Sequence, residues 1–174
     1  MIIKLKNKET LEIDLFKFKC SVGKNGFTKK KIEGDKKTPK GIFSIGNLYY
    51  RKDRIFKFET KLKAIQIKKK MGWCDDINSK YYNKPIKIKK NIKHEKLFRK
   101  DSIYDYLIVV EYNTIKPKPG KGSAIFLHLT NNYKKTAGCI AVKKKDMLII
   151  LKILTKKSRI KIALPLFLII GFVL

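Results

Sequence analysis

Apolar and charged residues alternate along most of this chain, and that alternation predicts strands. Residues 2–20 place apolar side chains at nearly every second position, which is the period of half-buried strands joined by a turn near 7–10. Residues 106–112, YLIVVEY, are β-branched and aromatic with little charge, and they predict a buried strand. A small-then-apolar run over 122–128 predicts another strand that ends at His128, and the alternation at 159–164 predicts a last one.

Only one segment has sustained helical spacing. Apolar residues from Met147 to Leu154 recur at that spacing, with Asp146 in the first turn and lysines at the end, as the helix dipole favours. Residues 91–104 predict an irregular or short-helical piece. Many strands, one main helix and no βαβ alternation predict a mixed, β-rich fold, closer to a β-sandwich or open barrel than to a doubly wound sheet. We expect a single domain over residues 1–163, followed by an apolar C-terminal tail at 164–174.

The net charge of +29 is large enough to attract an anionic polymer such as nucleic acid, anionic lipid or acidic cell-wall glycan. Only four of the 43 basic residues are arginines, and arginine is the residue that reads base edges and holds phosphates with two bonds. The composition therefore argues against specific nucleic-acid recognition. The lysines are spread along the whole chain, which is typical of a solvated surface.

Cysteine and histidine spacing predicts no metal site. The three cysteines Cys20, Cys74 and Cys139 form no CxxC pair, and the two histidines lie 34 residues apart. An odd count allows one disulfide and a free thiol, such as Cys20 paired with Cys74, or three free thiols. The first fifteen residues show no recognisable signal peptide. The tail at 164–174 is far shorter than the roughly 20 residues of a transmembrane helix, which leaves core packing or peripheral membrane contact.

One stretch, residues 122–142, combines a thiol with an imidazole, because His128 and Cys139 are eleven positions apart in it. A cysteine needs an imidazolium, a helix N-terminus or other positive charge to ionise at neutral pH, and His128, the helix near Lys144 and the lysines are candidates. Gly138 leaves room before the thiol for a substrate carbonyl, and backbone N–H groups there could form an oxyanion hole. A buried structural cysteine and a hydrogen-bonded histidine fit the same spacing.

The segments GSAIFLHL and TAGCIAVKKKDML resemble the active-site region of the YkuD-type L,D-transpeptidase family, in particular a small bacterial subgroup with Ala-Gly-Cys at the site. GDKKTPKGIF, GWCDDINSKYYN, HEKLFRKDSIYDY and PGKGSAIFLH resemble family segments in the same order, so the resemblance covers roughly residues 15–162. It implies that Cys139 attacks the carbonyl after the diamino acid of a peptidoglycan stem peptide and passes the acyl group to an amine. His128 is then the base, Gly138 belongs to the turn or oxyanion hole, and no cofactor is implied.

The commoner family motif is Ser/Thr-His-Gly-Cys, whereas Ala137 stands here before Gly138. The base must then be His128 or a remote residue such as His94. His94 and Glu95 also fit the pattern of this subgroup. The substrate-pocket candidates, with loop stabilisation as their alternative role, are Trp73, Asp75, Asp76, His94, Glu95 and Thr136.

The resemblance predicts peptidoglycan stem peptides as the partner and a role in cell-wall biogenesis or remodelling. Transpeptidase, carboxypeptidase and amidase reactions share the same acyl-enzyme and stay open. A non-catalytic cationic module that binds anionic polymer is an alternative of a different class. The chemistry predicts a location in the cell envelope or periplasm, and the missing signal peptide keeps a cytoplasmic alternative open.

Overall fold

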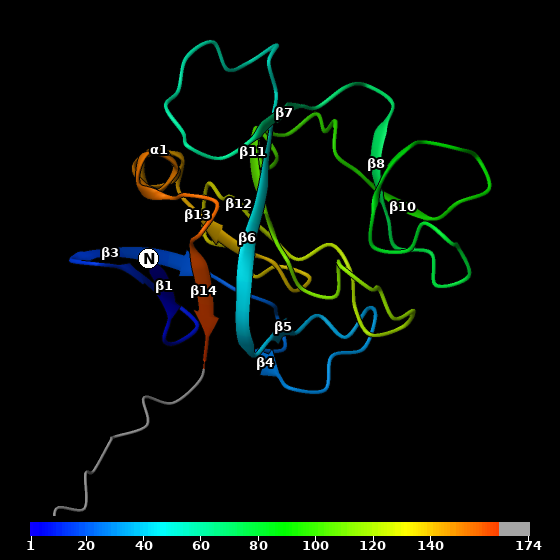
Figure 1. Ribbon diagram of the computed structural model, residues 1–174, viewed down its shortest axis with the longest axis horizontal. Coiled ribbons are helices and arrows are strands. Elements are labelled where there is room, and N and C mark those ends of the chain that lie inside the picture. The colour runs from blue at the N-terminus through cyan, green and yellow to red at the C-terminus, as the bar shows by residue number, and fades with distance from the viewer. Residues whose placement is uncertain (164–174) are drawn as a thin grey trace, which may run out of the picture.

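The computed structural model describes residues 1–163, and the apolar tail expected at 164–174 lies outside the described residues. Within that range the chain forms fourteen strands and one helix (Figure 1). In chain order these elements are β1 Ile2–Leu5, β2 Thr10–Ile13, β3 Phe16–Ser21, β4 Phe27–Thr28, β5 Thr38–Pro39, β6 Gly41–Tyr50, β7 Ala64–Gln66, β8 Met71–Cys74, β9 Pro85–Lys87, β10 His94–Lys96, β11 Tyr106–Val110, β12 Phe126–Leu129, β13 Ile140–Val142, α1 Lys144–Ile153 and β14 Arg159–Ile162.

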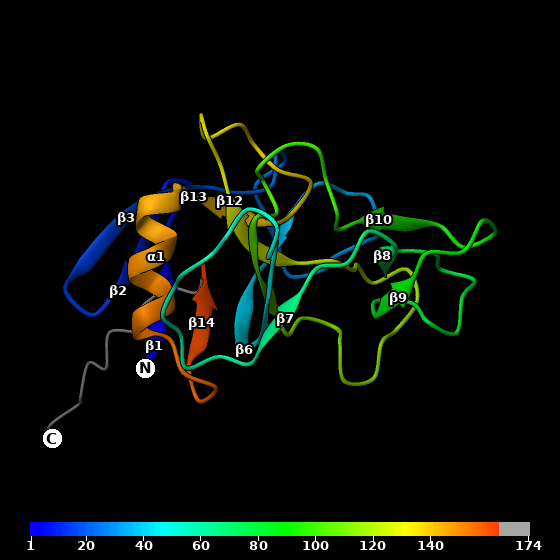
Figure 2. The same cartoon turned by 90° about the horizontal axis from the view of Figure 1, so that it is seen from above.

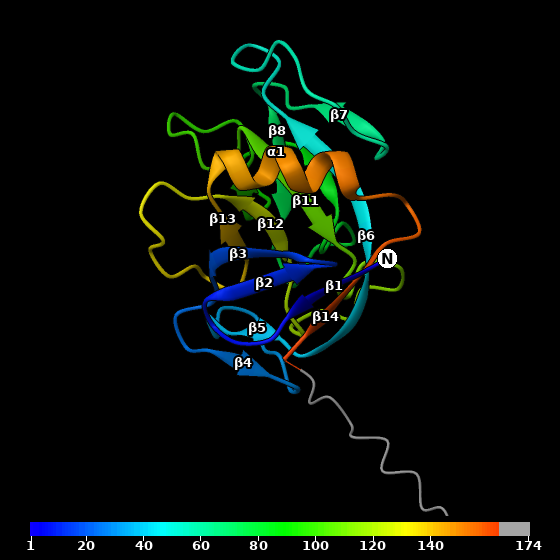
Figure 3. The same cartoon turned by 90° about the vertical axis from the view of Figure 1, so that its left-hand side faces the viewer.

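Nine of the strands form one sheet that curls back on itself. Its order is β11-β12-β13-β3-β2-β1-β14-β6-β7, and an additional pairing of β6 with β11 closes it into a barrel-like ring (Figure 3). The long strand β6 makes this closure, because residues 41–44 pair with β14 and residues 45–50 pair with β11. The mostly β architecture, with one helix after Cys139 in the described residues, confirms the fold class predicted from the sequence.

The strands β11, β12 and β13 separate two hydrophobic cores, because successive side chains in a strand point to opposite faces. One face carries Leu127 and Ile140 and shares its core with the buried side of α1. The other face carries Phe126 and Cys139, which pack with Trp73. The alternation therefore places every second residue, counted from Phe126 and from Cys139, on the face away from the helix.

Helix α1 does not support the thiol in the way that the sequence predicted. It begins at Lys144, after β13 has carried the chain away from Cys139, and its buried side chains belong to the opposite core. The field of a helix N-terminus acts only within about one turn. The predicted assistance to a Cys139 thiolate from this helix is therefore wrong.

A second sheet of three strands, ordered β10-β8-β9, stands at the end of the molecule opposite α1 (Figure 2). Residues 94–96 form its strand β10, so the helical alternative for 91–104 is wrong there. The strand predicted over 122–128 is confirmed only from Phe126, because Ala124 has a positive φ of 52° that interrupts extended backbone. Among residues 1–163, no helix is long and apolar enough to span a membrane.

Candidate active site

Cys139 and His128 line the same pocket, which has a volume of about 640 Å³. The parallel pairing of β12 with β13 sets His128 opposite Ala141, so Cys139 is the diagonal neighbour of His128 on the same face. Each residue is only 7% exposed. The two consecutive strands thus bring the thiol and the imidazole into one largely buried site.

The Cys139 thiol has two backbone partners. Its Sγ donates to the carbonyl oxygen of Ala124 at 3.1 Å, and the N–H of Phe126 donates to Sγ at 3.4 Å. Burial raises the pKa of the thiol far above its ordinary value, and the charge of Glu95 raises it further. The Phe126 N–H and Lys31 oppose this rise and do not overcome it. The thiol is therefore protonated at neutral pH, because burial and Glu95 outweigh the activation by surrounding lysines that the sequence predicted.

The imidazole of His128 is held in one tautomer. Its Nδ1 lies 2.8 Å from the carbonyl oxygen of Leu129, and because a carbonyl only accepts, Nδ1 carries the proton. The other ring nitrogen, Nε2, is then the free proton acceptor. Burial lowers the pKa of His128 to about 4, so the ring is neutral at neutral pH. The pocket thus pairs a neutral thiol with a neutral base.

Gly138 has a packing role that differs from the one predicted. Its φ is +143°, and an added Cβ would lie 2.9 Å from the carbonyl oxygen of Lys37. The space left by the missing side chain is therefore filled by the chain around Lys37 and does not admit a substrate carbonyl. The Gly138 N–H donates to Oγ1 of Thr136 at 3.1 Å, and Thr136 Oγ1 donates to the Cys139 carbonyl at 2.6 Å. In this arrangement the Gly138 N–H is engaged by Thr136.

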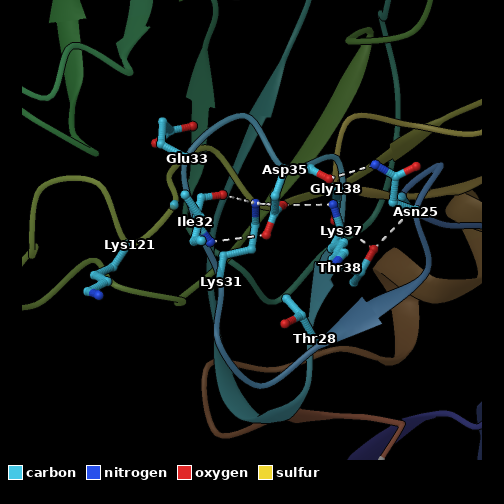
Figure 4. A network of polar contacts seen from close by, with 12 residues as sticks. Asn25, Thr28, Lys31, Ile32, Glu33, Asp35, Lys37, Thr38, Lys121 and Gly138 are labelled. Atoms are coloured by element: carbon cyan, nitrogen blue, oxygen red, sulfur yellow. Dashed lines mark hydrogen bonds and ion pairs between the residues drawn. The ribbon is translucent and has the colours of Figure 1, made fainter.

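The loop over residues 31–38 supports this turn (Figure 4). The carboxylate of Asp35 accepts hydrogen bonds from the Ile32 and Lys37 N–H groups at 3.0 and 2.8 Å and pairs with Lys31 Nζ at 2.5 Å. Thr38, fully buried, donates from Oγ1 to the Gly138 carbonyl at 2.9 Å. The segment GDKKTPKGIF therefore works as a support for the chain that carries Cys139.

Three of the predicted pocket residues, Asp75, Glu95 and Thr136, line the pocket. Trp73, Asp76 and His94 do not. Trp73 is buried, with Nε1 donating to Asn83 Oδ1 at 2.8 Å, and Asp76 accepts from the Asn78 N–H at 3.0 Å. His94 Nδ1 contacts the Ile92 carbonyl oxygen at 2.6 Å. These three contacts fit the loop-stabilising alternative, and the placement of His94 leaves His128 as the histidine beside Cys139.

Sequence reasoning missed Tyr104, whose ring packs edge-on against the ring of His128 and whose hydroxyl donates to Glu95. It lies in the segment HEKLFRKDSIYDY, where nothing distinguishes it from the other seven tyrosines. The cysteines Cys20, Cys74 and Cys139 are all free thiols. Within residues 1–163, no three His, Cys, Asp or Glu side chains are grouped to hold a metal ion.

The role of Gly138 predicts a measurable loss of stability in Gly138→Ala. Gly34→Ala is the matched control, because Gly34 also has a positive φ, +77°, but nothing within 4 Å of its added Cβ. We expect Gly138→Ala to lose about 1–3 kcal/mol more of the free energy of unfolding than Gly34→Ala, since only the former forces a close contact. Urea denaturation at pH 7 measures both, and equal losses would contradict a close approach of Lys37.

The site thus sets a buried histidine on β12 beside a buried cysteine that directly precedes β13, in a barrel-like sheet. The YkuD L,D-transpeptidase catalytic domain matches residues 3–162. The chain belongs to the L,D-transpeptidase catalytic domain family.

Two solved structures resemble this chain. One is the helical cell shape determining protein Pgp2 from Campylobacter jejuni, with 16% sequence identity and a TM-score of 0.49. The other is Bd1075 from Bdellovibrio bacteriovorus, with 14% identity and a TM-score of 0.46. Each comparison covers 92% of this chain and 46% of the other, so this chain spans less than half the length of either structure. No curated protein matches the chain.

Proposed function

We propose that this chain transfers acyl groups on peptidoglycan stem peptides, with Cys139 as the nucleophile and His128 as the general base. The observation that carries this proposal is the pairing of Cys139 with His128 in one pocket, where the Leu129 carbonyl leaves His128 Nε2 free to accept a proton. Membership in the L,D-transpeptidase family supports stem peptides as the substrate class. That substrate places the site of action in the cell envelope.

The first half of the proposed reaction forms an acyl-enzyme. His128 Nε2 takes the thiol proton as Sγ attacks the carbonyl carbon after the diamino acid of the stem. The imidazolium then gives this proton to the nitrogen of the departing D-alanine, the amide bond breaks, and a thioester to Cys139 remains. The Phe126 N–H, which already points at Sγ from 3.4 Å, stabilises the developing negative charge on sulfur.

The second half of the reaction restores the thiol. An acceptor attacks the thioester carbonyl, His128 takes a proton from it, and that proton returns to sulfur as the carbon–sulfur bond breaks. An amine of a second stem gives a cross-link, and water gives a trimmed stem. Because Ala137 stands where the commoner motif has a second histidine, His128 serves both halves.

Pocket charge supports the binding of a stem peptide, which carries carboxylates and amines. Lysine side chains and Arg99 line the pocket together with Asp75 and Glu95. We assign Asp75, Glu95 and Thr136 to its substrate-facing wall. Outside the pocket, the excess of lysines attracts anionic wall polymers and raises the local substrate concentration.

Mass spectrometry of the protein incubated with a purified disaccharide-tetrapeptide tests the function. A cross-linked dimer indicates transpeptidation, and a disaccharide-tripeptide indicates carboxypeptidase action. A carbapenem should add its mass to Cys139, which peptide mapping locates. Unchanged substrate together with an unmodified Cys139 would overturn the proposal. Salt-sensitive binding to an anionic glycan in that case would favour the cationic binding module.

A further inference from the structure

The segment Arg99–Asp105 holds His128 from two sides. The Ile103 carbonyl accepts the Leu129 N–H at 3.0 Å, and the Leu129 carbonyl in turn accepts Nδ1–H of His128 at 2.8 Å. The ring of Tyr104 meets the His128 ring edge-on, with centroids 5.3 Å apart and planes 70° apart. One short segment therefore contacts both the backbone acceptor of the imidazole and the imidazole ring itself.

Tyr104 is itself fixed in place. It is 5% exposed, and its ring packs edge-on against Phe126 at 6.0 Å between centroids. Its hydroxyl donates to Glu95, and the guanidinium of Arg99 lies 5.2 Å from its ring centroid. These contacts come from different parts of the chain, so the ring cannot turn away from His128 without breaking several of them.

Two of the four arginines bind this segment from outside it. Arg54 donates to the Lys100 and Asp101 carbonyls, both at 2.8 Å, and pairs with Asp105 at 2.9 Å. Arg51 donates to the Arg99 carbonyl at 2.5 Å. A guanidinium presents several donors in a rigid fork, whereas a lysine is a single flexible point charge. In a chain with 39 lysines, Arg51 and Arg54 therefore supply contacts to backbone carbonyls that a single lysine could not supply together.

We propose that Tyr104 is a positioning residue for His128, and that Arg51 and Arg54 clamp the segment Arg99–Asp105 so that Tyr104 stays against the imidazole. This inference rests on the proposed role of His128 as the base. The edge-on ring fixes the plane of the imidazole, and the clamped backbone fixes the Leu129 carbonyl that selects the tautomer. If the ring were not held in this orientation, His128 would remain in the pocket, but Nε2 would carry the proton for part of the time and could not accept one from Cys139.

Imidazole ¹⁵N NMR tests this placement without any substrate. The chain has two histidines, so a ¹⁵N-histidine sample gives two ring systems, and His94→Gln assigns them. We expect a single Nδ1–H tautomer for His128 in the wild type and in Tyr104→Phe, which keeps the ring. Tyr104→Leu should give a mixture of tautomers and a His128 pKa closer to 6.5, with unchanged His94 signals as an internal control of folding. A single unchanged tautomer in folded Tyr104→Leu would overturn the proposal.

Arg54→Lys tests the clamp and is the second variant should Tyr104→Leu fail to fold. It keeps the charge and loses the fork, so we expect the same tautomer mixing to a smaller extent. Arg159→Lys is the matched control, because Arg159 lies on the exposed side of β14. Mixing in Arg54→Lys alone supports the clamp, and no mixing, or equal mixing in both variants, contradicts it.

Alkylation of Cys139 by iodoacetamide shows whether Tyr104 acts through His128. We expect Tyr104→Leu to slow alkylation of Cys139 about tenfold when the rest of the sequence is wild type. In a His128→Gln background, Tyr104→Leu should have no further effect on the rate, as a double-mutant cycle requires. An equal loss in both backgrounds would overturn the proposal. Because neither alkylation nor NMR uses peptidoglycan, a failure to process stem peptides leaves these outcomes interpretable and bears only on the proposed function.

Discussion

Cys139→Ala is expected to abolish turnover of the stem tetrapeptide and the carbapenem adduct while leaving the fold intact. No other thiol replaces it, because neither Cys20 nor Cys74 lines the pocket. Alanine keeps most of the buried volume of cysteine but removes the partner of the Phe126 N–H at 3.4 Å. Leaving that buried donor unpaired should cost about 1–3 kcal/mol of the free energy of unfolding, which lowers Tm without unfolding the domain.

The measurement combines product analysis by mass spectrometry with a thermal melt of the same preparation. Cys74→Ala is the matched control, because Cys74 is also a buried free thiol but lies on β8, in the three-stranded sheet. We expect Cys74→Ala to retain turnover. Residual turnover in Cys139→Ala at more than a few per cent of the wild-type rate would contradict the assignment of the nucleophile.

The sequence pattern was sufficient to predict an element where the buried residues recur with the period of a strand or a helix. Residues 106–110 and the helix over 144–153 were predictable, because their own alternation or helical spacing decides which side faces a core. The expected strand over 122–128 fails before Phe126 for a non-local reason. The N–H of Ala124 is bonded at 3.0 Å to the side chain of Asn83, which lies 41 residues earlier in the chain, and Ala124 adopts a positive φ. No local pattern carries that contact.

The candidate site likewise has features that local sequence predicts and features that depend on distant contacts. Residue type and spacing singled out His128 and Cys139, and the family resemblance was needed to predict their roles. The structure brings both into one pocket. The state of those groups was not predictable, because burial and Glu95 raise the pKa of the thiol against the surrounding lysines. The packing role of Gly138 depends on its close approach to Lys37, which lies 101 residues earlier in the sequence. Tyr104 carries no signal until the fold sets its ring against His128.

His128→Gln is expected to lower the rate of acyl transfer by about 10²–10⁴-fold, the usual contribution of a general base. A glutamine amide can donate to the Leu129 carbonyl as Nδ1–H does, but its oxygen does not take up a proton. Cys139 would then have to lose its proton to water, which its raised pKa opposes. His94→Gln is the matched control, since His94 is outside the pocket and should leave the rate unchanged. A rate in His128→Gln within a factor of three of wild type would mean that another group is the base.

The same variant should change how stability depends on pH. Burial lowers the pKa of His128 to about 4 in the folded protein, whereas an unfolded histidine has a pKa near 6.5. The unfolded chain therefore binds a proton that the folded chain rejects. The free energy of unfolding is therefore unaffected by this group above pH 6.5 and falls by roughly 3 kcal/mol in all as the pH drops from 6.5 towards 4. Glutamine does not titrate, so urea denaturation of His128→Gln should show a smaller acid loss than the wild type. If the free energies of unfolding of the two proteins ran parallel from pH 7 to pH 4, His128 would not be held neutral by burial. The acid loss of the reaction rate should then lie near pH 6.5 instead of near 4.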